Sequence, residues 1–228
     1  MKRSLVNERI RAALRFMEAC RFHLPPFAFW SPAEWAEKGP ECDGIRRCRL
    51  GWDVTDFGSG DFAKTGLLLF TLRNGTPGEA AAGGKSYAEK VMVVEAGQRT
   101  PVHFHWKKRE DIINRAGGTL VIRLWRSDEK EGRSERPLSV ETDGTARTLP
   151  AGGAVRLSPG ESITLEPRVY HEFFAEGGRC LVGEVSSVND DLSDNRFLEP
   201  LPRFSALEED EPPAFLLCNE YPPPAGGG

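Results

Sequence analysis

The sequence predicts a mainly β protein, a jelly-roll barrel with N-terminal helices packed outside it. From residue 66 onward, short apolar runs alternate with glycine- and proline-containing turns, the pattern of a barrel built from short strands. Before residue 66, apolar residues recur at intervals of three and four, as in helices. The 228 residues can bury one core, so we expect one structural domain. Its expected parts are an N-terminal helical and loop extension (1–65), the barrel (66–188) and a C-terminal arm (189–228).

Two helices are predicted before the barrel. The first has an apolar face suited to lying on a sheet, formed by Ile10, Ala13, Leu14, Met17 and Cys20. The second is expected to begin after Ser31, because Pro32 suits the first helical position and Glu34 completes a capping box with Ser31. Gly39 is expected to end this second helix.

The barrel region is predicted to hold a series of short strands. Residues 75–84 are expected to form a loop and Gly117-Gly118 a turn, because glycine permits the backbone angles that turns need. The predicted strands are Gly66–Leu72, Tyr87–Glu95, Thr119–Trp125, Ala154–Leu157, Ser162–Leu165, His171–Ala175 and Cys180–Val188.

The composition argues against several classes of partner. A net charge of −4 and a pI near 5.7 disfavour binding to nucleic acid or to an anionic membrane surface. No run approaches about eighteen uncharged apolar residues, and the N-terminus does not resemble a signal peptide, so we expect a cytoplasmic protein. The scattered cysteines form no Cys-x-x-Cys pair and are expected to be reduced thiols. They are Cys20, Cys42, Cys48, Cys180 and Cys218.

Three of the four histidines belong to one pattern with metal-ligand spacing. His103 and His105 are two residues apart, so on a strand they share a face at a separation of roughly 7 Å. Glu110 lies five residues after His105, so on one straight strand its side chain would face the opposite side. We therefore expect a tight hairpin over residues 106–109 to turn Glu110 toward the same ion. Two histidines at this spacing also occur on exposed edge strands, but the conjunction with Glu110 and His171 favours a metal site. His23 is expected to be structural.

The ligand types narrow the choice of metal. Three imidazoles and one carboxylate favour a first-row cation, Mn, Fe, Co, Ni or Zn, over calcium or magnesium. The order of affinities does not choose among these five metals.

Three charged residues near the ligands are candidates for catalysis. Glu184 lies in the apolar run 180–185, where a charge is costly to bury unless it is paired, and we expect it to be a general base. The alternative is a surface carboxylate on the outer face of that strand. Lys90 or Lys108 is expected to polarise a substrate oxygen, and the alternative is that both lysines are solvated.

Four further residues are predicted to bind substrate. Trp52 belongs to the segment 51–62, whose aromatic, acidic and glycine residues suit a polyhydroxylated ligand but also suit a tight surface turn. Asp190, Asp194 and Arg196 belong to the segments 189–191 and 194–197, which could cover the mouth of the barrel. Their alternative role is a turn held by a salt bridge between Asp194 and Arg196.

The spacing of the ligands resembles the first cupin motif. That spacing is Gly97-x5-His103-x-His105-x4-Glu110-x6-Gly117. The resemblance implies that the expected jelly roll is a cupin barrel.

The second cupin motif is matched less completely. Gly160 and His171 are in place, but Glu166, Arg168 and Ala175 stand where proline, glycine and asparagine are usual. These departures affect the shape of turns and not metal ligation.

Longer segments resemble those of the cupin-type D-lyxose isomerases. They are residues 24–30, 51–58, 103–106, 110–115, 189–191 and 195–200. This resemblance implies a manganese-dependent aldose–ketose isomerase that interconverts D-lyxose with D-xylulose and often D-mannose with D-fructose. It also implies His103, His105, Glu110 and His171 as metal ligands, and a homodimer, but it assigns no base.

Isomerisation of a hydroxy-aldehyde moves a proton between adjacent carbons through an enediolate, whose charge a divalent cation stabilises. Glu184 is expected to carry that proton, although a hydride shift between the carbons stays open. Basic residues at 46–47 and 107–109 leave a phosphosugar isomerase as an alternative. An iron-dependent cupin dioxygenase with the same four ligands and a sugar-binding cupin without activity are further alternatives.

Overall fold

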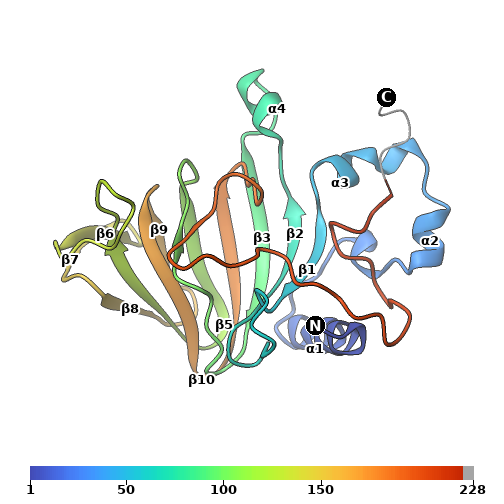
Figure 1. Ribbon diagram of the computed structural model, residues 1–228, viewed down its shortest axis with the longest axis horizontal. Helices are drawn as coiled ribbons and strands as arrows, with labels where there is room; N and C mark the ends of the chain where they lie inside the picture. Colours follow the sequence, from blue (N-terminus) through green and yellow to red (C-terminus); the bar gives the residue numbers. More distant parts are fainter. Residues whose placement is uncertain (223–228) are drawn as a thin grey trace.

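A computed structural model describes residues 1–222 and shows an antiparallel barrel with helices against one side (Figure 1). The predicted mainly β fold with N-terminal helices outside the barrel is confirmed. The helical segments are α1 (Arg3–Ala19), η1 (Pro26–Phe29), α2 (Pro32–Ala36), η2 (Pro40–Cys42), α3 (Asp43–Arg47) and α4 (Pro77–Ala81). The strands are β1 (Gly51–Thr55), β2 (Leu67–Arg73), β3 (Tyr87–Val94), β4 (His103–Phe104), β5 (Glu110–Arg126), β6 (Leu138–Thr142), β7 (Thr145–Leu149), β8 (Gly153–Leu157), β9 (Ser162–Leu165), β10 (Val169–Ser187) and β11 (Arg196–Phe197).

Two long strands hold the barrel together. The strand order is β1-β2-β3-β10-β5-β9-β6-β7, with β8 on β5, β4 on β10 and β11 on β4. Strand β5 pairs with β9 through its first half and with β8 through its second half. Strand β10 pairs with β4 near its start and with β3 along its second half. Because β5 and β10 also pair with each other, they connect β3 and β4 on one side of the barrel with β8 and β9 on the other.

The predicted turn at Gly117-Gly118 is instead a bend within β5. Gly117 has φ +97°, and a Cβ there would lie 2.1 Å from the carbonyl oxygen of Arg179 on β10. Glycine therefore allows the two backbones to approach closely where the β5–β10 register shifts, between Glu176 and Cys180. The segments 119–125, 171–175 and 180–188, predicted as separate strands, are consequently parts of β5 and β10, except that β10 ends at Ser187.

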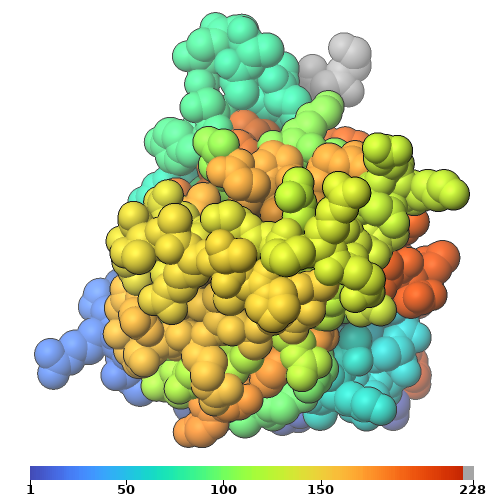
Figure 2. Space-filling model, turned by 90° about the vertical axis from the view of Figure 1, so that its left-hand side faces the viewer, coloured from blue at the N-terminus to red at the C-terminus, as the bar shows by residue number. Residues whose placement is uncertain are grey.

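Four other predictions about elements need correction. The predicted loop 75–84 contains α4, which Thr76 caps and which projects from the barrel (Figures 1 and 2). Strand β4 pairs with β10 and β11, so residues 106–109 connect different parts of the sheet and do not form a hairpin. Helix α2 has the predicted capping box at Ser31 but ends at Ala36, before Gly39. Strands β1, β6 and β7 were not predicted.

The sheet separates two apolar cores. Leu69 and Met92 of β2 and β3 face the inside of the barrel, whereas Phe70 and Val91 face α1. Burial on both faces explains why β2 and β3 are almost continuously apolar. Helix α1 covers the outer core with the face predicted from its sequence, including Ile10.

The C-terminal arm is held against α1. Arg3, 2% exposed, forms ion pairs with Glu209 and Glu220, and Asn7 donates to Glu211 at 2.6 Å. The last part of the predicted arm, residues 223–228, lies outside the described residues. Strand β1 of the predicted N-terminal extension joins the barrel sheet by pairing with β2.

All five cysteines are free thiols. Among residues 1–222, none of the helices combines the length and apolar character needed to span a bilayer.

Replacing Gly117 should weaken the bend. We expect Gly117→Ala to lower the free energy of unfolding by about 2–4 kcal/mol, because its Cβ meets the β10 backbone in a left-handed conformation. Urea unfolding followed by circular dichroism measures this change. Gly177→Ala is the matched control, because Gly177 has φ +72° but none of the described atoms lies within 4 Å of its Cβ, and it should cost about 1 kcal/mol. Equal losses in the two variants would contradict the steric explanation.

Candidate active site

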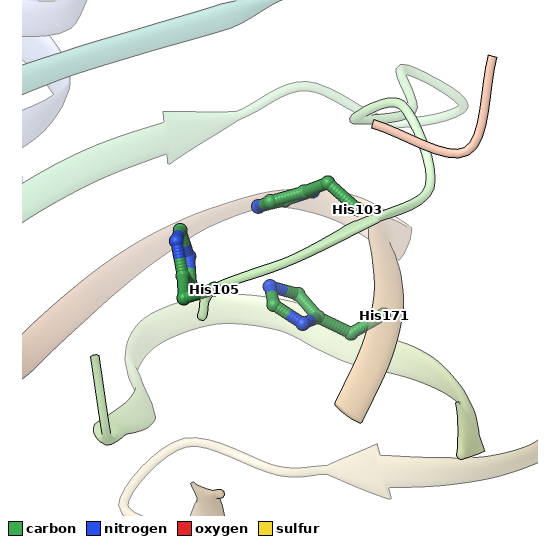
Figure 3. Close-up of side chains that lie close together, drawn as sticks. All are labelled: His103, His105 and His171. Carbon is green, nitrogen blue, oxygen red and sulfur yellow. The ribbon is translucent and has the colours of Figure 1, made fainter. Parts of the chain in front are cut away.

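Three imidazole rings converge at one point beside the barrel core (Figure 3). His103 on β4 lies directly opposite His171 on β10, and their ring centroids are 4.3 Å apart. His105 follows β4 on the same side. One ring nitrogen from each histidine lies within 4.8 Å of the others. The structure thus brings together the three histidines that the sequence predicts as metal ligands.

Each of these rings is oriented by a hydrogen bond to a backbone carbonyl. A carbonyl can only accept, so Nδ1 carries the proton and Nε2 presents a lone pair toward the centre of the cluster. The three Nδ1–carbonyl distances are 2.8 Å for His103 to Pro101, 2.9 Å for His105 to Asp194 and 3.0 Å for His171 to Val169.

The carboxylate of Glu110 completes the cluster. Its Oε1 lies 3.2 Å from Nε2 of His171 and 3.5 Å from Nε2 of His105. Within residues 1–222 this buried oxygen has no hydrogen-bond partner, whereas Oε2 lies 2.7 Å from Nζ of Lys108. Lone pairs of nitrogen and oxygen therefore face one another without a donor between them, an arrangement that a cation would stabilise. The residues fit a metal ion.

The protonation states agree with this role. Burial, followed by the proximity of His171 and His105, holds the pKa of His103 well below its usual value. Burial likewise lowers the pKa of His171. Burial would raise the pKa of Glu110, but Lys108 and His105 outweigh it and hold that pKa well below its ordinary value. The neutral imidazoles of His103 and His171 and the ionised carboxylate of Glu110 are in the forms that bind metals.

A second buried group of charges adjoins the ligands. Glu184 on β10 is directly opposite Lys90 on β3, and its Oε1 lies 3.3 Å from Nζ of Lys90 and 2.8 Å from Nζ of Lys108. Lys108 therefore links Glu184 to Glu110. All four side chains are at most 6% exposed. Two ammonium groups and two carboxylates balance one another, as buried charges require.

Glu184 is ionised in this environment. Burial would raise its pKa, but Lys108 and then Lys90 outweigh burial, and the pKa of Glu184 is lowered. The pKa of Lys108 is raised, since Glu110 and Glu184 outweigh the effect of its burial. A carboxylate base and a charged donor thus lie side by side.

A cavity of about 40 Å³ joins these groups. Leu69, Met92, Ile112 and Phe173 give it an apolar floor, and the histidines and the Lys–Glu network form one wall. The rest of its lining includes Phe57 from the β1–β2 connection and, from the C-terminal arm, Asp191, Asn195, Phe197 and Arg203.

Known proteins with similar sequences identify the family. The family described as D-lyxose isomerase matches residues 1–221. A protein of Serratia proteamaculans named D-lyxose/D-mannose isomerase is 52% identical over 224 residues, covering 97% of this chain and 98% of that protein. A protein of Escherichia coli O157:H7 with the same name is 50% identical over the same coverage. The chain belongs to the D-lyxose isomerase family. It is therefore an enzyme of the isomerase class.

Solved structures show the same fold at lower sequence identity. L-ribose isomerase from Cellulomonas parahominis, solved with L-ribose, is 17% identical with a TM-score of 0.60, covering 91% of this chain and 98% of that one. L-ribose isomerase from Geodermatophilus obscurus is 15% identical with a TM-score of 0.61 and the same coverage. The predicted cupin-type barrel is confirmed by this likeness.

The four residues predicted to bind substrate do not line the cavity of this D-lyxose isomerase family member. Trp52 faces α1, where its Nε1 donates to the carbonyl of Ala28 at 2.8 Å. The carboxylate of Asp190 accepts from the backbone of Leu192 at 3.1 Å and so shapes its own turn.

Asp194 and Arg196 also have other partners. The carboxylate of Asp194 accepts from the backbone N–H groups of Lys107 and Lys108, both at 2.9 Å. Arg196 pairs with Glu131 at 3.2 Å, and in the described chain it forms no salt bridge with Asp194. Asp194 thus holds the segment that carries Lys108.

The segments predicted to cover the mouth of the barrel contain Asp191, Asn195 and Phe197, which line the cavity but were not singled out, and sequence reasoning missed Arg203. Arg203 donates to Asp53 at 2.5 Å and to Asp191 at 3.3 Å, while its Nη1 has no partner within the described part of the chain. Burial would raise the pKa of Asp191, but Arg203 and then Lys90 lower it strongly. The only local signal was the acidic run containing Asp191. Nothing in the irregular segment around Arg203 distinguishes it from a surface arginine.

Removing one histidine should abolish tight metal binding. We expect His171→Ala to weaken binding of a divalent cation by at least about 100-fold. Removing a residue that only hydrogen-bonds to a metal ligand already lowers metal affinity by about 10–100-fold, and removing the ligand itself should cost more. Metal analysis and titration calorimetry of the purified variant measure this. His23→Ala, which alters the exposed fourth histidine, should retain full binding. Unchanged affinity in His171→Ala would remove it from the metal site.

Proposed function

We propose that this enzyme is a manganese-dependent aldose–ketose isomerase that converts D-lyxose to D-xylulose and D-mannose to D-fructose. The observation that carries the proposal is the ionised, buried Glu184, which shares a cavity with the clustered ring nitrogens of three histidines and with the carboxylate of Glu110. Two relatives at 52% and 50% identity, named D-lyxose/D-mannose isomerase, support the choice of sugars.

The side chains suit proton transfer next to a carbonyl group. Such a transfer needs a base that is ionised at neutral pH and donors placed where negative charge develops. Glu184 takes the proton from one carbon and returns it to the adjacent one. Lys108 and Lys90 hold the Glu184 carboxylate and donate to the sugar oxygens. A divalent cation held by His103, His105, Glu110 and His171 would supply Lewis-acid stabilisation of charge on the substrate oxygens.

Residues of the C-terminal arm contact the remaining hydroxyl groups of the sugar. Asp191, Asn195 and Arg203 line the cavity and offer both donors and acceptors. Asp194 acts on the site indirectly, by fixing the backbone of Lys108.

Free sugars fit this site better than sugar phosphates. The basic residues that suggested a phosphate site are already paired with neighbouring acids or, for Lys107, do not line the cavity. The ion pairs are Arg46–Asp43 at 2.8 Å, Arg47–Glu79 at 3.0 Å, Arg109–Glu166 at 2.7 Å and Lys108–Glu184 at 2.8 Å.

Metal removal and replacement test the activity. The chelated enzyme should be inactive with D-lyxose, and Mn²⁺ should restore D-xylulose formation more effectively than Mg²⁺, because imidazole ligands suit first-row metals. Product analysis with a panel of aldoses measures this. Oxygen consumption without isomerisation would indicate a dioxygenase instead, and competition by inorganic phosphate would indicate a phosphosugar enzyme.

Substituting the proposed base tests its role. Glu184→Gln should keep its metal but lose isomerisation by about 10²–10⁴-fold, because an amide cannot accept the proton. Exchange of the C2 proton with solvent, followed by NMR in D₂O, should be lost in parallel. Glu89→Gln is the control, because Glu89 lies next to Lys90 on β3 and pairs with Arg73 away from the cavity. Full activity of Glu184→Gln would exclude Glu184 as the base.

We also propose that the enzyme is a homodimer. Light scattering of the purified protein should then give twice the chain mass of 25.2 kDa. A monomer mass at all concentrations would contradict the dimer without affecting the assignment of the site.

A further inference from the structure

The cavity is smaller than the sugar that we propose it binds. Its volume of about 40 Å³ has room for about three waters, at roughly 10–15 Å³ of such space for each. A pentose has five carbons and five oxygens, and it shares the site with a metal ion. One wall of the cavity must therefore move to admit the sugar.

Most of the walls are fixed. The floor belongs to strands β2, β3, β5 and β10, which are paired on both sides, and β2 and β3 are also buried on both faces. The near part of the arm is tied to the ligand segment, because β11 pairs with β4 and Asp194 accepts from Lys107 and Lys108. Arg203 and Asp191 of the arm bind each other, and Arg203 also binds Asp53 of β1. The lining residue that none of these contacts holds is Phe57, in the segment 56–61 after β1, in which Gly58–Asp61 are exposed.

Phe57 is held in the cavity wall by an unusual backbone conformation. It is 5% exposed and has φ +53°, a left-handed conformation that is strained for a bulky residue. The carboxylate of Asp56 accepts from the backbones of Gly58 at 3.0 Å and Gly60 at 3.1 Å, which stabilises this turn. Gly58 and Gly60 also have positive φ, so flexible residues follow the strained one.

Contacts of residues 56–58 with the arm hold this segment closed. The ring of Phe57 meets Phe197 edge-on at 5.7 Å, and Phe197 lies 5.5 Å from the ring of His103. Ser205 accepts from the backbone of Asp56 at 2.8 Å. A Cβ on Gly58 would lie 2.9 Å from the ring of Pro202, which shows how closely the two segments pack.

We propose that Phe57 is a substrate-contacting residue mounted on a flap, residues 56–61, which opens to admit the sugar and closes the aromatic ring onto its C–H face. This inference rests on the proposed function, because the occupant is the sugar of that reaction. Closure places an apolar ring opposite the charged wall and excludes water from the proton transfer. The strained conformation then belongs to the flap as it closes the empty cavity, and the ring lies farther out when it rests on the sugar.

Two phenylalanines of the same connection test the proposal. Phe57 and Phe62 are both 5% exposed, but Phe62 packs in the core beneath α1 and does not line the cavity. We expect Phe57→Ala to raise KM for D-lyxose by about tenfold or more, with a smaller change in kcat. Phe62→Ala should lower the thermal midpoint at least as much but leave KM within about twofold. Equal KM values in the two variants, measured well below both midpoints, would overturn the proposal.

Ser205→Ala provides a second variant if Phe57→Ala does not fold. It removes a hydroxyl that ties the flap to the arm, and Ser205 does not line the cavity. We expect weaker binding of the unreactive alditol of D-lyxose, measured by calorimetry, with metal content unchanged. Unchanged alditol affinity would count against the flap. Absence of both turnover and alditol binding in the unaltered enzyme would remove the proposed function and this inference together, whereas equal KM values remove the inference alone.

Discussion

The hydrogen bond from Nδ1 of each ligand histidine to a backbone carbonyl decides what the other ring nitrogen can do. In His103 and His171 the acceptor lies two residues earlier in the chain, so the geometry of the strand end fixes the ring. In His105 the acceptor is the carbonyl of Asp194, so the arm orients a ligand from a distant part of the sequence. The cluster of lone pairs is thus built from backbone geometry and is ready for a cation before one binds.

The segment between β4 and β5 places the charged residues around that cluster. It passes from one part of the sheet to another, and the carboxylate of Asp194 holds it by two backbone N–H groups. Lys108 is thereby brought between Glu110 and Glu184, where it keeps both carboxylates ionised. Loss of one of these charges leaves the buried network with an uncompensated charge, which costs more than the pair contributes. The metal ligands and the proposed base therefore depend on one network.

Much of this site could be predicted from local sequence patterns. The period of a strand places His103 and His105 on one face, and the apolar run around Glu184 marks it as a buried charge. The bend at Gly117 was misread because a glycine pair suits both a turn and a close crossing of strands. Strand β7 was missed because its residues are mostly exposed and show no apolar period. Arg203 could not be found, since its role comes only from tertiary contacts with Asp53 and Asp191.

The register of β1 explains why Trp52 does not reach the cavity. All five residues of β1 are buried, but its apolar and polar residues alternate, so Trp52 and Val54 share one face and Asp53 and Thr55 the other. Trp52 and Val54 pack in the core beneath α1, whereas Asp53 binds Arg203 and Thr55 contacts Ser205. A difference of one position reverses the face of a strand residue. Phe57 lies beyond the end of the strand, where strand alternation no longer applies, and its left-handed turn makes it the aromatic residue of this segment that meets the cavity.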